Sequence, residues 1–143
     1  MQTPLSILLK EKSSKIQTLT ANDSCYHCAE LLSQFGIGAL LVMEGERLQG
    51  IISERDLINK LVNKKLDPDT VKVSEVMSRN VLTVSPETTV QQAMQIMTEK
   101  RFRHLPVLEN DKLVGIISIG DITKWMMQQQ QQEISALTGY IHG

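Results

Sequence analysis

The apolar positions of this chain recur at helical spacing in some stretches and run without interruption in others. Residues 24–35 carry an apolar stripe at helical spacing, and Gly36 follows as a helix stop. Two short apolar runs come next, at 39–43 and 48–52, separated by a Glu-Gly-Glu turn sequence. This order predicts a helix and then a β-hairpin. A further helix is expected from Ser53 to about residue 62.

The same order of elements returns later in the chain. A helix is predicted over residues 85–100, beginning at Ser-Pro-Glu. The apolar runs 105–108 and 113–117 predict a second hairpin, which turns at an Asn-Asp sequence. The last helix is expected to start near Ser118 and to continue through five glutamines toward Leu137, because glutamine is a good helix former.

The two halves are an internal repeat. Sliding the sequence against itself by 65 positions aligns residues 15–63 with 80–128 without a gap, and ten aligned pairs are identical. The strongest match is GIISERD at 50–56 against GIISIGD at 115–121. A gapless repeat determines the architecture, and each copy alone is too short to bury a good core. We therefore predict an α/β (α+β) fold of two repeats, each a short sheet with packed helices.

The repeat suggests how the chain is divided. We expect residues 1–66 to hold the first copy together with an N-terminal helix, which Thr3 caps with Pro4 at its first position. The second copy is expected at 67–128, and a helical tail outside the repeat at 129–143. An apolar stripe that could lie on a partner is formed by Ile134, Leu137 and Ile141.

Composition excludes several classes of function. The chain has 143 residues, 41% of them hydrophobic and 22% charged, which is ordinary for a globular domain. A net charge of −1 gives no general attraction to nucleic acid or to an anionic membrane. No apolar run approaches the length of a membrane span, and the N-terminus does not read as a signal peptide. The cytoplasm is therefore the expected compartment.

The repeated GIISxxD motif allows two interpretations. Ser53 and Asp56, and equally Ser118 and Asp121, fall on the first turn of a predicted helix. A helix start attracts phosphate, and a carboxylate beside it can accept hydrogen bonds from a ribose diol. The alternative is a capping box that stabilises the helix start without any ligand. Recurrence of both residues, and the poor helix former Gly120 between them, favour the ligand interpretation.

The combination of motifs resembles a tandem pair of CBS domains, a Bateman module. The resemblance rests on the two GIISxxD copies, on SPETTVQQAMQIM at 85–97 and on RHLPV at 103–107, and covers about residues 5 to 128. It implies two copies related by a pseudo-twofold axis, with clefts that bind adenosine-containing ligands. AMP, ADP or ATP is implied, and in some members NAD or S-adenosylmethionine, bound as a regulator and not as a catalytic cofactor.

The resemblance also implies roles for particular residues. Asp56 and Asp121 would hold ribose hydroxyls, with Ser53 and Ser118 near ribose or phosphate. The residues that would enclose the adenine are Thr18, Leu19, Ile51, Ile52, Thr83, Val84, Ile116 and Ile117.

Cations that could hold phosphate lie mostly in the second copy. Arg101, Arg103 and His104 precede its hairpin, where the first copy has no charge, and Arg55 is a fourth candidate. The alternative is a solvated basic loop. The two ligand sites are expected to be unequal.

Cys25 and Cys28 could suggest metal or redox chemistry. A closed zinc site needs four ligands, and the other histidines are distant in sequence. The repeat aligns both cysteines with apolar positions, so small buried side chains on a helix face are the favoured interpretation. Trp125 and the methionines Met94, Met97, Met126 and Met127 are expected in the core or an interface.

Three hypotheses follow. The first is a regulatory module, not an enzyme, that senses adenine nucleotides and acts on another, unidentified protein chain. The second is a dimeric interaction or scaffold protein with vestigial clefts. The third is redox or metal chemistry at the cysteines. A homodimer is expected because thin layers leave apolar helix faces uncovered.

Overall fold

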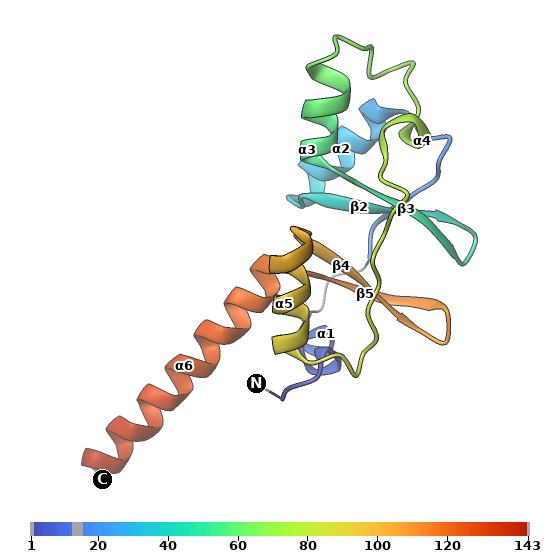
Figure 1. The fold of residues 1–143 in the computed structure, drawn as a ribbon. Coiled ribbons are helices and arrows are strands. Elements are labelled where there is room, and N and C mark those ends of the chain that lie inside the picture. Colours follow the sequence, from blue (N-terminus) through green and yellow to red (C-terminus); the bar gives the residue numbers. More distant parts are fainter. Residues whose placement is uncertain (1, 13–15, 143) are drawn as a thin grey trace. The chain divides into compact units, whose positions relative to one another are not determined.

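The computed structural model describes residues 2–12 and 16–142, with side chains up to residue 139. The chain divides into two compact units (Figure 1). One, the first-copy unit, combines Lys15–Thr83 and Leu108–Val114. The other, the second-copy unit, combines Met1–Ser14, Val84–Val107 and Gly115–Gly143. Each unit therefore draws on stretches that are separate in the sequence.

The first-copy unit contains a three-stranded sheet with order β1-β2-β3. Strand β1 runs parallel to β2, and β2 runs antiparallel to β3. The elements are β1 (Thr18–Leu19), α2 (Cys25–Phe35), β2 (Ala39–Glu44), β3 (Arg47–Ser53), α3 (Glu54–Leu57), its π-helical continuation η1 (Ile58–Val62) and α4 (Val73–Val76).

Local signals explain helix α2 and the hairpin. The Ser24 hydroxyl accepts a hydrogen bond from the backbone N–H of His27 and so caps the helix start. Gly36 ends the helix in the left-handed conformation, which glycine adopts at no steric cost. Gly45 has a positive φ at the hairpin turn. The predicted helix and hairpin of the first copy are confirmed.

The second-copy unit repeats this plan on a smaller sheet. Its elements are α1 (Leu5–Glu11), α5 (Val90–Lys100), α6 (Ile119–His142) and the two-stranded sheet of β4 (His104–Glu109) and β5 (Lys112–Ser118), except for the hairpin end Leu108–Val114, which falls in the first-copy unit. A parallel bridge joins Val84 to Val107, as Leu19 pairs with Val42 in the first copy. Both members of the pair are shifted by the 65 positions of the repeat.

Helix α5 begins later than the sequence suggested. It starts at Val90 rather than near Ser85, because Thr89 and Gln92 form a capping box at its first turn. Ser85 instead belongs to a turn in which its backbone N–H donates to the Thr88 hydroxyl. The expected start of this helix was therefore wrong.

Helix α1 packs in the second-copy unit. Leu5 and Leu8 are buried in a core that also contains Val90, Leu105 and Ile117. This differs from the expected division at residue 66, which grouped the N-terminal helix with the first copy. Pro4 also differs from expectation, since it is the N-cap and not the first helical residue.

Helix α4 has the same place in the first-copy unit that α1 has in the second. The N-cap residue of α4, Lys72, bridges to Ser24 at the start of α2, and Pro4 bridges to Thr89 at the start of α5. Each short helix thus adjoins the long helix of its own unit. The continuous core of the first-copy unit includes Leu40, Ile52, Val73 and Val76, together with both cysteines of α2.

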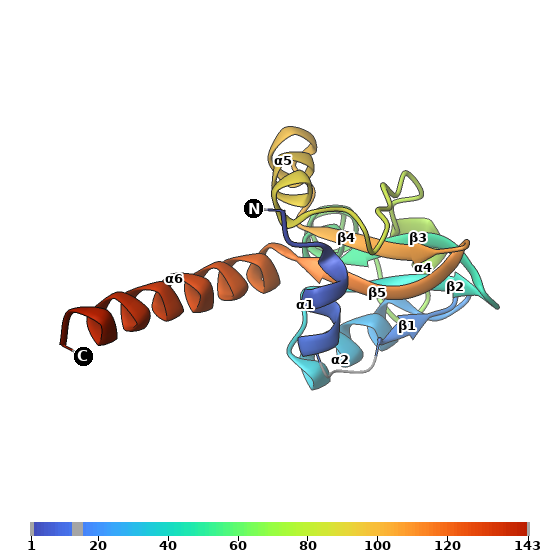
Figure 2. The same ribbon diagram turned by 90° about the horizontal axis from the view of Figure 1, so that it is seen from below.

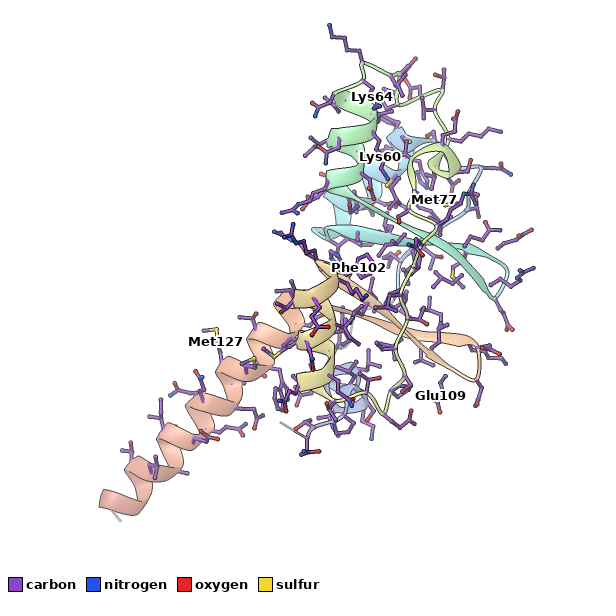
Figure 3. All side chains as sticks on the ribbon, viewed as in Figure 1. Lys60, Lys64, Met77, Phe102, Glu109 and Met127 are labelled. Atoms are coloured by element: carbon purple, nitrogen blue, oxygen red, sulfur yellow. The ribbon has the colours of Figure 1, made fainter. Side chains whose placement is uncertain are left out.

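Helix α6 is one continuous helix to His142, which confirms the helix predicted toward Leu137 and continues beyond it (Figure 2). Trp125 is buried against the second-copy core, which confirms its expected place. Beyond it the helix extends away from β4 and β5, and Met127 points away from α5 (Figure 3). Ile134 and Leu137 are exposed, whereas the side chain of Ile141 lies outside the described residues.

Within the part of the chain that the structure describes, none of the helices combines the length and the apolar character needed to cross a membrane.

Candidate functional site

The first GIISxxD motif forms a capping box at the junction of β3 and α3. The Ser53 hydroxyl accepts from the backbone N–H of Asp56 at 3.2 Å. The Asp56 carboxylate accepts in return from the Ser53 backbone N–H at 2.9 Å and from the Ser53 hydroxyl at 3.1 Å. Both return bonds use one carboxylate oxygen, Oδ2. The structural alternative weighed for this motif, a helix cap, is therefore present.

The second motif repeats the reciprocal pattern at the junction of β5 and α6. Asp121 Oδ2 accepts from the Ser118 backbone N–H at 2.8 Å, and the Asp121 backbone N–H donates to the Ser118 hydroxyl at 3.1 Å. Both aspartates are only partly exposed, with 18% of the Asp56 side chain and 28% of the Asp121 side chain accessible. The cap again occupies Oδ2 and leaves Oδ1 to other partners.

A lysine contacts each aspartate, and neither lysine was singled out from the sequence. Lys60, on the helix that follows β3 (Figure 3), lies 3.2 Å from Asp56 Oδ1 and also donates to the Val76 carbonyl. Lys12 donates to Asp121 Oδ2 at 2.8 Å. The i, i+4 spacing of Asp56 and Lys60 was a visible signal. No sequence signal links Lys12 to Asp121, because 109 positions separate them.

These contacts determine the charge state of Asp121. Burial alone would raise the pKa of its carboxyl, but the hydrogen bonds from Lys12 and Ser118 and the positive charge of Lys12 outweigh that effect. The pKa therefore lies below its ordinary value of 3.8. Asp121 is an anion at neutral pH and can accept hydrogen bonds from hydroxyl groups.

One phosphate candidate of the second copy, Arg103, has its backbone beside the start of α6. The Arg103 carbonyl accepts from the Ile119 backbone N–H at 3.0 Å, and Gly38 makes the equivalent bond to Glu54 in the first copy. The repeat thus has an exposed arginine at one helix start and a glycine at the other.

The other cationic candidates lie at the ends of helices or strands. Arg101 is exposed and ends α5 in the left-handed conformation, and His104 is half-buried at the first residue of β4. Arg55 is exposed on the first turn of α3. The second copy therefore has more cationic candidates than the first.

The candidates for an adenine pocket differ in burial. Ile52 and Ile117 are fully buried in the two cores, and Leu19 is buried in β1. Ile51 and Ile116 are half-buried. Thr18 is exposed, and Thr83 and Val84 are half-buried.

Neighbouring segments already use the strand backbone near these residues. Ile51 exchanges two hydrogen bonds with Ser78, its N–H donating at 3.0 Å and its carbonyl accepting at 2.8 Å. In the second copy the Ile116 carbonyl accepts from Lys12 Nζ at 2.9 Å.

The motif glycines permit close approach of these segments. A Cβ at Gly50 would lie 2.7 Å from the Ser78 carbonyl oxygen and 2.9 Å from Met77 Sδ. A Cβ at Gly115 would collide with the Leu9 side chain. Glycine is needed at Gly50, because the atom it would meet is a backbone oxygen, whereas at Gly115 the Leu9 side chain would have to move aside.

Cys25 and Cys28 are fully buried free cysteines in the first-copy core, as the sequence favoured. Burial, the nearby Cys25 and the charge of Asp56 raise the pKa of Cys28 to about 12. Burial and Glu75 raise the pKa of Cys25 as well. Both thiols are therefore protonated and unreactive at neutral pH. Among the described residues there is no cluster of three or more His, Cys, Asp or Glu residues that could hold a metal ion.

Comparisons with known proteins agree with this geometry. A family model described as the CBS domain matches residues 10–63 and again 73–128. The mitochondrial CBS domain-containing protein CBSX3 of Arabidopsis thaliana is 33% identical over 150 residues, covering 99% of this chain and 73% of that protein. The chain therefore belongs to the CBS-domain family and contains two CBS domains in tandem, which confirms the resemblance and the α+β fold class.

Two solved structures are similar over most of the chain. One, described as a signal-transduction protein with CBS domains from Burkholderia ambifaria, is 40% identical with a TM-score of 0.86, covering 90% of this chain and 96% of that one. The other is the CBS domain pair of protein MJ0100 in complex with 5′-methylthioadenosine and S-adenosylmethionine. It is 26% identical with a TM-score of 0.77, covering 90% of this chain and 99% of that one.

Proposed function

We propose that this chain is a regulatory CBS pair that binds an adenosine-containing ligand at its two Ser-x-x-Asp motifs and acts on another protein. The ligand is AMP, ADP, ATP or NAD, bound as a regulator. Asp56 and Asp121 accept hydrogen bonds from the ribose hydroxyls, and Ser53 and Ser118 lie next to ribose or phosphate. The cytoplasm remains the compartment expected from the sequence.

One observation carries this proposal: capping employs only one oxygen of each aspartate. In Asp121 the Oδ1 atom accepts no hydrogen bond from the described residues, because the bonds from Ser118 and Lys12 both end on Oδ2. A carboxylate oxygen has two lone pairs, so each aspartate can cap its helix and still accept from a ribose diol. The capping and ligand interpretations of the motif are therefore compatible.

Two further observations support the proposal. The CBS pair of MJ0100 binds two adenosine derivatives that share the ribose and the adenine but carry no phosphate. In the present chain, Arg101 and Arg103 add exposed cations near one helix start, which would favour a phosphorylated ligand there. We accordingly assign the stronger phosphate contacts to the second copy.

A calorimetric panel tests the proposal. AMP, ADP, ATP, NAD and S-adenosylmethionine are titrated into the wild-type protein and into the double variant Asp56→Ala/Asp121→Ala. At least one ligand should bind the wild type and should bind the double variant at least tenfold more weakly. Equal affinities, or no binding by any of the five ligands, would contradict the proposal.

A second candidate, a dimeric scaffold, is favoured by the exposed part of α6. Met127, Ile134 and Leu137 have 64%, 57% and 63% of their surfaces exposed, and they follow one another at intervals of seven and three residues. This spacing places them on one helix face, as in a coiled-coil seam. A single helix with an uncovered apolar stripe gains little stability in water. We propose a homodimer to which this stripe contributes.

Light scattering on the intact chain and on a variant ending at Met127 tests the dimer. The intact chain should be dimeric at micromolar concentration. The shortened chain should form a weaker dimer, which dissociates at a higher protein concentration than the intact dimer does, and it should still bind nucleotide. A monomeric intact chain would contradict the homodimer. A dimer that binds none of the panel ligands would favour the scaffold function over the regulatory one.

A further inference from the structure

Lys12 comes from the opposite end of the chain to the motif that it contacts. It is the C-cap residue of α1, and its backbone N–H donates to the Leu8 carbonyl at 3.1 Å. Its ammonium donates to two acceptors in the second copy, the Ile116 carbonyl at 2.9 Å and Asp121 Oδ2 at 2.8 Å. One ammonium therefore bridges the end of strand β5 and the first turn of α6.

Those two acceptors belong to the residues assigned to the ligand. Asp121 is the expected ribose acceptor, and Ile116 is an expected neighbour of the adenine. The ion pair is largely shielded, with 29% of the Lys12 side chain and 28% of the Asp121 side chain exposed. The contact is therefore less screened by salt than an ion pair on the open surface.

The first copy has no equivalent contact. Counting from the N-caps Pro4 and Lys72, the position of Lys12 corresponds to Asn80, which is uncharged. Asp56 is paired instead with Lys60 of its own helix, through the other carboxylate oxygen, and 45% of the Lys60 side chain is exposed. Only the second motif has a cation delivered by a distant segment, within the residues that the structure describes.

We propose that Lys12 is a built-in competitor for the ligand at the second motif. The ammonium holds Asp121 Oδ2 and the Ile116 carbonyl, and an adenosine ligand gains both acceptors in full only when Lys12 withdraws. This inference rests on the proposed function, since it concerns the same site. It adds that occupation of the second motif is opposed by the N-terminal segment and that of the first is not.

The competition couples the ligand to helix α1. When only a fraction of the protein is in the state that can bind, the apparent affinity of the ligand is reduced by that fraction. Linkage is reciprocal, so a bound ligand must loosen Lys12 to the same extent that Lys12 weakens the ligand. Leu9, in the last turn of α1, has its side chain against Gly115, and Lys12 is the C-cap of that helix, so this turn is the part that the ligand would release.

The test compares two lysines of the same segment. AMP is titrated into a parent protein carrying Asp56→Ala, which silences the first motif, and into the same protein with Lys12→Met or Lys10→Met. Lys10 is exposed, and its side chain makes no hydrogen bond or ion pair with the described residues. Lys10→Met therefore makes the same change in charge and in side-chain length as Lys12→Met. Thermal unfolding of each variant confirms that it is folded.

Lys12→Met should bind AMP about two- to fivefold more tightly than the parent, which is the range expected from removal of one partly shielded ion pair. Lys10→Met should bind like the parent. In the parent, AMP should also speed hydrogen exchange of the Lys12 amide, an effect that a purely structural lysine would not produce.

The outcomes separate this inference from the proposed function. If the parent binds AMP and Lys12→Met binds it equally or more weakly, the competitor role is overturned and the proposed function stands. Weaker binding would make Lys12 a direct ligand contact. If neither the parent nor the variants bind AMP, the proposed function fails at this motif and the competitor role fails with it.

Discussion

Replacement of Asp121 by alanine gives two readouts that distinguish a ligand site from a helix cap. The variant loses the hydrogen bond that the carboxylate accepts from the Ser118 backbone N–H, and it loses the ion pair with Lys12. A cap of this kind is worth about 0.5–2 kcal/mol, and a partly exposed ion pair adds at most about 1 kcal/mol. We therefore expect the free energy of unfolding to fall by about 1–2 kcal/mol.

The expected effect on nucleotide affinity is larger. A carboxylate that accepts from ribose hydroxyls makes charge-assisted hydrogen bonds worth about 1.5–3 kcal/mol, which corresponds to a loss of roughly tenfold to a hundredfold in affinity. Asp121→Asn should fall between the wild type and the alanine variant, because the amide oxygen still accepts but the charge is gone. Adenine alone should bind with little change, since it has no ribose.

The matched control is Gln92→Ala on α5. Gln92 completes the capping box with Thr89, through bonds of 3.0 and 3.1 Å, and has no assigned contact with ligand. Urea denaturation should show a comparable loss of stability in this variant, and calorimetry with AMP, ATP and NAD should show no loss of affinity. If Asp121→Ala behaves like Gln92→Ala in both assays, the aspartate is a cap only and the reasoning is refuted.

Gly50→Ala should lower the free energy of unfolding by about 1–3 kcal/mol, because the new methyl group meets the Ser78 carbonyl. At Gly120 a new methyl group meets nothing closer than 3.6 Å, so Gly120→Ala should raise the melting temperature. The Cys28 thiol should not react with a thiol reagent at about pH 8 in the native protein, because burial raises its pKa to about 12, and should react in denaturant. Rapid labelling in the native state would contradict its burial. Because the pKa of Asp121 is lowered in the folded protein, this carboxylate stabilises the fold at pH values above 3.8, the ordinary pKa expected for the unfolded chain. This stabilisation is lost as the pH falls through the pKa of the folded protein. Urea denaturation at about pH 6 and about pH 3 should therefore show a larger acid loss in the wild type than in Asp121→Asn.

The parts of the fold predicted from the sequence are those governed by short-range signals. The hairpin of the first copy follows from two apolar runs around Gly45. The parallel pairing of Leu19 in β1 with Val42 in β2 recurs as Val84 with Val107, as the repeat implies. The reciprocal bonds of both motifs follow from a serine and an aspartate three residues apart.

The parts that escaped prediction depend on long-range packing. An apolar stripe shows that Leu5 and Leu8 will be buried, but it does not show in which unit. The Lys12 contact follows from that choice, because the end of α1 can reach Asp121 only once α1 has packed in the second-copy unit. The late start of α5 at Val90 reflects competition between two nearby start signals, of which the Thr89 cap prevails.

The placement of α1 has a consequence for the order in which the chain folds. During synthesis α1 appears before every other element, yet its partners in the core, such as Leu105 and Ile117, follow only after the whole stretch Lys15–Thr83 has been made. That stretch contains most of the first-copy unit and can fold on the ribosome while the Leu5 and Leu8 side chains are still exposed to water. To complete the second-copy unit, α1 must then meet partners that lie beyond this whole stretch, and closing so long a loop slows folding. A fragment that starts after residue 66 would lack two leucines of its core, and adding residues 2–12 as a separate peptide should restore them.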